Sequence, residues 1–295
     1  MLSAMFARVI AVWLAVAGAV VLPRAGQQGE PASARLRGMG LVEAPGRVPV
    51  FFVAQARERA MRLRRSLEAV QAWYRQQLDV DVPLVLAVVD AGTEKRLVDL
   101  VSTKEAPTRE RPRLIAIRDR MEDARPAAGA DAEHAAGGVL QGEQILFHDL
   151  GHAYADALPL RTGSKSADEF VACVFEVAYL VAKRPDMSYL LEERRSGQPP
   201  PTPGYSTLAD LDYLDGRGES ITRANYFWFM WHLSRLADAL TADKPLKESV
   251  ERLAKAFPDA KRETPEGVVK RLEGALPGFE RAAGALTGSS GLARV

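Results

Sequence analysis

Two histidines, His148 and His152, lie four residues apart in the stretch from Gly142 to Leu158, and the whole chain contains only four histidines. Because one turn of an α-helix separates residues with this spacing, both imidazoles project from the same helix face. Two imidazoles on a rigid turn supply half of the ligands of a tetrahedral zinc site. A catalytic zinc ion takes three protein ligands, so the fold must bring at least one more ligand to this face.

The first residues of the chain have the composition of a signal peptide. Arg8 precedes an apolar run at residues 9–22, and Ala25 follows closely after it. The run is shorter than the roughly 20 residues of a membrane-spanning helix. We therefore expect residues 1–25 to be a signal peptide. The protein would be secreted or periplasmic, or membrane-anchored if the segment stays uncleaved.

The net charge and the cysteine content argue against a nucleic-acid-binding protein and against a disulfide-stabilised scaffold. The chain has 39 basic and 38 acidic residues, and residues 1–25 contain two arginines and no acid, which leaves 37 and 38. A net charge near −1 lacks the basic footprint of a nucleic-acid-binding protein. The single cysteine, Cys173, cannot form an intramolecular disulfide, so the chain is not a disulfide scaffold.

The order of apolar patterns predicts an α+β fold. Residues 82–89 form a β-branched apolar run that is typical of a buried strand, and residues 113–118 alternate as a second strand does. We expect a lobe with a small sheet and the metal-site helices at 48–195, followed by a helical C-terminal lobe at 205–282. A flexible linker is expected at 26–47 and a tail at 283–295. The expected helices cover about 52–78, 94–101, 139–158, 167–183, 221–240, 244–257 and 265–275.

The segment His148-Asp149-Leu150-Gly151-His152 resembles the His-Glu-x-x-His motif of zincin metallopeptidases. The resemblance implies a zincin-like lobe, a zinc cofactor held by both histidines, a peptide or protein substrate, and hydrolysis by a metal-activated water. It also implies that Asp149 is the general base where the family carries Glu. Because Asp is one methylene shorter, its oxygens lie roughly 1.5 Å farther back, and misplacement of about 1 Å costs on the order of 100-fold in rate. We expect a slow hydrolase.

The resemblance also indicates where the third metal ligand lies. Glu169-Phe170-Val171-Ala172-Cys173 resembles the Glu-x-x-Ala-Asp pattern of glutamate-type zincins, which makes Glu169 the third ligand and puts Cys173 in place of the aspartate that orients a ligand histidine. In a second register, Asp168 is the ligand. A third interpretation makes both acids ordinary first-turn residues of a helix.

Two other functions remain open. A catalytically inactive zincin-fold binding protein would keep the motif without the activity. The pair His148-Asp149 also resembles HD-type metal-dependent phosphohydrolases, which need a further histidine upstream, for which His134 is the candidate. On the aromatic-rich segment 221–240, His232, Tyr226 and Arg223 are candidate stabilisers of a developing oxyanion. Membrane association is expected only through an uncleaved N-terminal segment.

Overall fold

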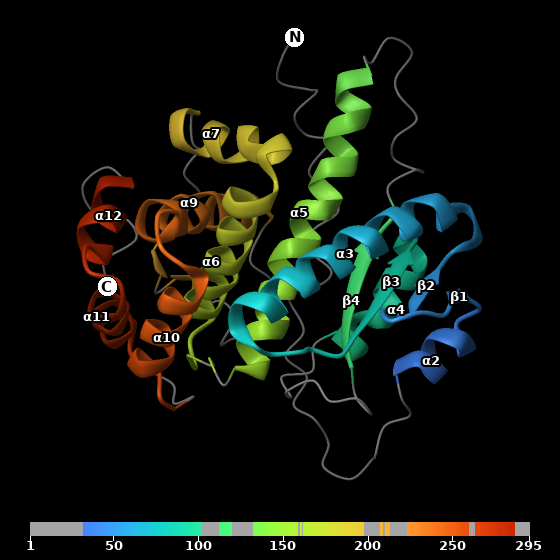
Figure 1. The fold of residues 1–295 in the computed structure, drawn as a ribbon, viewed down its shortest axis with the longest axis horizontal. Helices are drawn as coiled ribbons and strands as arrows, with labels where there is room; N and C mark the ends of the chain where they lie inside the picture. The colour runs from blue at the N-terminus through green and yellow to red at the C-terminus, as the bar shows by residue number, and fades with distance from the viewer. Residues whose placement is uncertain are drawn as a thin grey trace. The chain divides into compact units, whose positions relative to one another are not determined.

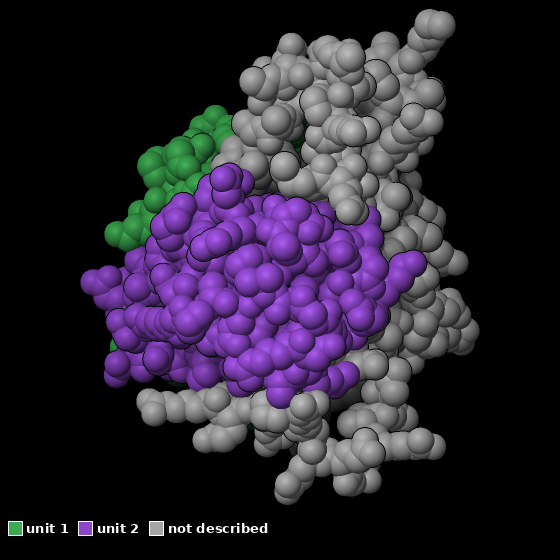
Figure 2. Space-filling model, turned by 90° about the vertical axis from the view of Figure 1, so that its right-hand side faces the viewer, with its two compact units in different colours: residues 1–20, 158–295 green, residues 21–157 purple. Residues whose placement is uncertain are grey.

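The computed structural model describes residues 32–101, 112–119, 132–158, 160, 162–197, 207–208, 210–212, 223–259 and 263–286. Its described residues up to Ala157 form one compact unit, and those from Leu158 onward form a second (Figure 2). The expected signal peptide at 1–25 lies outside the described residues. Within the described ranges, no helix combines the length and the apolar character needed to cross a membrane.

The first unit is built on a four-stranded sheet in the order β1-β2-β3-β4 (Figure 1). Strand β1 is antiparallel to β2, whereas β2, β3 and β4 run parallel. All six residues of β3 are buried, as its β-branched sequence predicts, whereas β4 has three buried and three partly exposed residues. The strands are β1 (Val42–Ala44), β2 (Val50–Phe52), β3 (Leu84–Val89) and β4 (Arg113–Arg118).

The N-terminal half of this sheet differs from the sequence-based expectation. Part of the stretch 26–47, which we expected to be a flexible linker, forms helix α2 (Ala32–Gly38) and strand β1. Strand β2 occupies the start of the expected helix 52–78, so that α3 begins only at Arg57 and ends at Leu78. Elements of three residues are too short to show a period, which is why pattern analysis misses them.

Helices cover both faces of the sheet because strand side chains alternate between the two faces. One face forms a hydrophobic core with α2 and with α4 (Ala91–Val101). Helix α3 contacts β2 and β3 and also packs against α5 (Figure 1). The residues of the α2/α4 core are Leu36, Leu41, Phe51, Val85, Ala87, Val89, Leu97 and Leu114.

The helix that carries the paired histidines, α5, runs from Ala132 to Ala157. It begins earlier than the expected residue 139, because the alanines at its start favour a helix despite two glycines. The helix therefore includes His134. Three contacts fix α5 in its unit: the Tyr154 hydroxyl donates to the Gln71 carbonyl of α3 (3.1 Å), Ser66 Oγ donates to Glu143 (2.5 Å), and Arg113 of β4 pairs with Asp156.

The second unit is entirely helical in its described residues. Its central helix, α6 (Lys165–Lys183), is buried on nearly all sides and packs along α9 (Arg223–Thr241). The compact units divide after Ala157, whereas we expected the first lobe to reach residue 195, because the α6 sequence is apolar enough to form the centre of a helical core. The remaining helices are α7 (Ser188–Ser196), α10 (Leu246–Ala256), α11 (Pro265–Ala275) and α12 (Phe279–Leu286).

The beginning of α6 is organised by an aspartate that is distant in sequence. Ser164 is the N-cap, with its hydroxyl accepting from Ala167 N (3.3 Å). Ser166 donates its backbone N–H to Asp212 Oδ1 (2.7 Å), and both serine hydroxyls contact Asp212 Oδ2 at 2.8 and 3.1 Å. Burial raises the pKa of the Asp212 carboxyl, and these hydrogen bonds oppose that rise. Asp212 thus stabilises the first turn of α6.

We expect Asp212→Ala to lower the free energy of unfolding by about 2 kcal/mol, since hydrogen bonds to a charged group contribute about 1.5–3 kcal/mol and the serines would lose their acceptor. Urea unfolding followed by circular dichroism measures the effect. Asp210→Ala is the matched control, because the Asp210 carboxylate accepts from Thr207 N (2.8 Å), three residues away, and the loss of such a local bond should cost about 1 kcal/mol. Equal losses in the two variants would contradict this role.

Candidate metal centre

The two motif histidines lie on one side of α5. Their ring centroids are 4.9 Å apart with the planes at 88°, so the rings meet edge to face. His148 is buried and His152 is half-buried. The helix holds them in place because the apolar residues around them are fully buried. These residues are Leu146, Phe147, Leu150, Ala153 and Tyr154.

Helix α6 carries three further side chains with metal-binding chemistry on a single stripe. Glu169, Cys173 and Glu176 are separated by four and then three residues, which places them on the same face. All three are at most 1% exposed. Carboxylates are rarely buried to this extent unless a cation or a metal balances their charge. The stripe therefore requires a balancing charge.

The three predicted ligands come together as one group. His148, His152 and Glu169 each offer a ligand atom, and these atoms all lie within 4.8 Å of one another. Asp168, the alternative ligand, belongs to neither of the two candidate groups found among the described residues. Its carboxylate instead accepts hydrogen bonds from the backbone N–H and the hydroxyl of Thr162, at 3.2 and 2.8 Å. Asp149, the proposed base, is half-buried.

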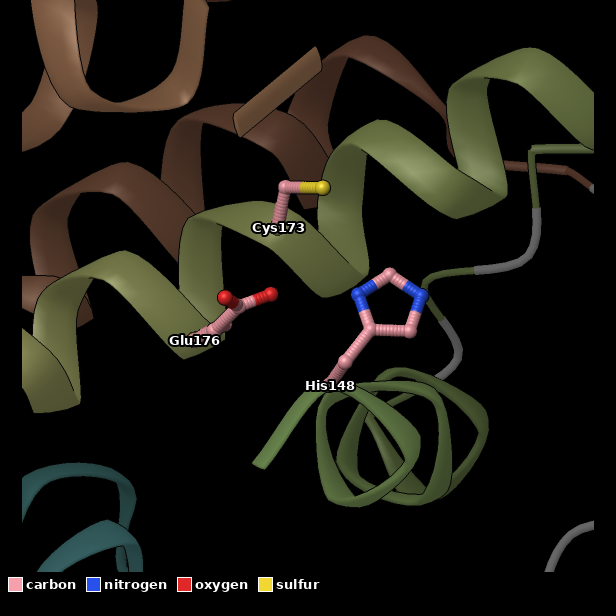
Figure 3. A group of neighbouring side chains, drawn as sticks. All are labelled: His148, Cys173 and Glu176. Atoms are coloured by element: carbon pink, nitrogen blue, oxygen red, sulfur yellow. The ribbon is translucent and has the colours of Figure 1, made fainter. Parts of the chain in front are cut away.

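A second group shares one histidine with the first. His148, Cys173 and Glu176 also offer ligand atoms within 4.8 Å of one another, and all three side chains are buried (Figure 3). We had assigned Cys173 to an orienting position and had given Glu176 no role. The signal that could have identified Glu176 is a carboxylate well inside an apolar helix, one turn beyond Cys173 and two turns beyond Glu169.

Each buried carboxylate has a basic partner. Lys165 Nζ lies 2.6 Å from Glu169 Oε1, one helical turn away. Arg194 of α7 donates from both Nη1 and Nη2 to Glu176 Oε1, each at 3.2 Å. The Ser234 hydroxyl of α9 donates to Cys173 Sγ at 3.5 Å. These partners fix the orientation of the acids and the thiol, as the outer shell of a metal site does.

His232 of α9 belongs to neither group. Burial, with a smaller contribution from Arg235, lowers the pKa of His232 to about 4, so its ring is neutral at neutral pH. Its ring centroid lies 4.3 Å from that of Trp228, and its Nδ1 is buried without a hydrogen-bond partner within the described part of the chain. The structure does not describe the side chains of Arg223 and Tyr226. An oxyanion-stabilising role for this helix therefore stays a prediction.

Buried histidine, cysteine and glutamate side chains of this chain could hold a metal ion, and their nitrogen, sulfur and oxygen donors do not single out zinc. No family model, curated protein or solved structure matches the chain. The function must therefore be argued from the chemistry of the side chains.

Proposed function

We propose that this chain is a zinc-dependent, metallopeptidase-like protein that hydrolyses peptide bonds. His148, His152 and Glu169 would hold the ion. The observation that supports this proposal is the convergence of their ligand atoms within 4.8 Å. Two imidazoles and one carboxylate match the donor set of a catalytic zinc site that keeps one position open for water. When bound, the ion would lower the pKa of that water and polarise the peptide carbonyl.

Asp149 would take the proton from the attacking water. It directly follows the ligand His148 on α5, where a carboxylate on the next helical position can reach the water. The shorter side chain keeps its oxygens roughly 1.5 Å from the place a glutamate would reach, which limits the rate. Glu169, by contrast, would contribute charge and position and would not exchange protons.

A second candidate function is a non-catalytic binding protein with a zincin-like metal site. The observation that favours it is Asp149 at the position of the general base, because its shorter side chain holds the oxygens farther from a metal-bound water than a glutamate would. The two candidates share the metal site and differ in whether peptides are cleaved.

Metal analysis of the purified full-length protein tests the shared part of the proposal. We expect about one zinc ion per chain, and we expect His148→Ala to lose it, because a ligand histidine cannot be replaced by a methyl group. His232→Gln is the matched control, since this buried histidine belongs to neither candidate group and its variant should keep the metal. A wild-type protein without tightly bound metal would refute the proposal.

An aspartate variant separates the proposal from the phosphohydrolase alternative. In an HD-type site the adjacent aspartate is itself a metal ligand, so Asp149→Asn would release the ion. In the proposed site Asp149 acts on the water and is not a ligand of the ion, so Asp149→Asn should keep the zinc while losing peptide hydrolysis. Metal loss in this variant would favour the phosphohydrolase.

A further inference from the structure

We propose that the resting metal ion of this protein is held by His148, Cys173 and Glu176, a thiolate-containing set, rather than by the two histidines and Glu169. The inference rests on the proposed function, because the two sets share His148. It deepens that function by stating which donors hold the ion when no substrate is present. Because the two sets share His148, they are alternatives for one ion.

The geometry of the second set suits a tetrahedral ion. Its ligand atoms lie within 4.8 Å of one another, and the three side chains point toward a common space in Figure 3. In a tetrahedral site with bonds of about 2.0–2.3 Å, neighbouring ligand atoms are roughly 3.3–3.6 Å apart. A separation within 4.8 Å is compatible with these side chains as ligands of one ion.

Charge balance favours the second set over the first. Two neutral imidazoles and Glu169 supply one negative charge, which Lys165 already cancels at 2.6 Å. The Cys173 thiolate and Glu176 together supply two negative charges, and Arg194 cancels one of them. A dication bound by the second set, with Arg194 beside it, therefore leaves a net charge of one positive unit. The same ion bound by the first set, with Lys165 beside it, leaves two. Because an uncompensated charge is costly in a buried environment, this difference stabilises the ion on the cysteine side.

Burial and outer contacts point in the same direction. Every ligand of the second set is at most 5% exposed, whereas His152 of the first set is half-buried. Both donors of Arg194 contact Glu176 Oε1, and Ser234 donates to Cys173 Sγ. Such contacts orient a ligand before the metal binds, and their loss alone typically lowers metal affinity by 10–100-fold. The thiolate also favours ions such as zinc and copper(I) over hard ions such as magnesium and calcium.

Titration of the metal-free full-length protein with Co²⁺ tests the inference, because a thiolate–cobalt bond gives a strong near-ultraviolet charge-transfer band. We expect one cobalt ion per chain and this band in the wild type. The band should disappear in Cys173→Ser, and Cys173→Ser and Glu176→Gln should each weaken cobalt binding at least tenfold. His152→Ala, which removes the other histidine of α5, should keep the band. Its affinity for cobalt should change less than about threefold.

Cobalt binding without the band, insensitive to Cys173→Ser and abolished in His152→Ala, would overturn the inference and leave the proposed function standing. A cysteine-dependent band in a protein that cleaves no peptide would support the inference and refute the peptidase. X-ray absorption of the wild-type zinc protein is a second measurement that needs no variant. It should show one sulfur at about 2.3 Å, and a shell of nitrogen and oxygen alone would overturn the inference.

Discussion

Replacing Arg194 with methionine is expected to lower the free energy of unfolding of the metal-free protein by about 3–5 kcal/mol. The substitution leaves the Glu176 carboxylate, which is 1% exposed, without the guanidinium whose two nitrogens contact it. Breaking a buried ion pair from one side costs this much because the remaining charge stays buried. Urea unfolding in the presence of a chelator measures the difference.

Arg184→Met is the matched control for this prediction. Arg184 pairs with Asp186 in the same unit, but the Asp186 side chain is 60% exposed. Surface pairs of this kind contribute about 0–1 kcal/mol. The double variant Arg194→Met, Glu176→Gln should regain much of the loss, because no buried charge remains. If Arg194→Met were as stable as the control, the Glu176 charge would not depend on Arg194.

Asp149→Glu is expected to raise the rate of peptide hydrolysis by about 10–100-fold without changing the metal content. The added methylene moves the carboxylate oxygens forward by roughly 1.5 Å, to the distance from which a glutamate takes a proton from a metal-bound water. Cleavage of a quenched fluorescent peptide library by the zinc-loaded wild-type and variant proteins measures the gain.

Asp168→Glu provides the control for the activity measurement. Asp168 accepts hydrogen bonds from Thr162 and belongs to neither candidate group, so lengthening it should leave the rate unchanged or lower it. If Asp149→Glu remained inactive with a full complement of zinc, the chain would be the non-catalytic binding protein. A gain in both variants would mean that the added activity does not come from the motif.

The elements with long, regular patterns were predictable from the sequence. The buried strand β3 follows from its β-branched run, α11 lies at the expected residues 265–275, and the chain is mixed α/β with a small sheet and a helical C-terminal part. The i, i+4 histidines and the acid on the following helix identified one candidate group. These features depend on residues that are close together in the sequence, so the sequence alone is enough to predict them.

The features that escaped prediction depend on distant residues or short segments. Strands β1 and β2 are too short to show alternation. The first turn of α6 is held through Ser164 and Ser166 by Asp212, which lies nearly 50 residues away in the sequence. Glu176 could not be assigned a role from the sequence because its partner Arg194 lies on another helix. Cys173 is a candidate metal ligand only because the fold places it near His148 and Glu176. Pairings of this kind are set by tertiary packing.

The order of the two units along the chain has a consequence for biosynthesis. The sheet unit and its histidine helix end at Ala157, so a ribosome completes them before it synthesises α6. At about 5–20 residues per second, Glu169, Cys173 and Glu176 follow within seconds. During that interval the nascent chain presents only two imidazoles, too few ligands to retain an ion. Metal acquisition would therefore be a late maturation step, and newly made protein should be metal-free until α6 has folded.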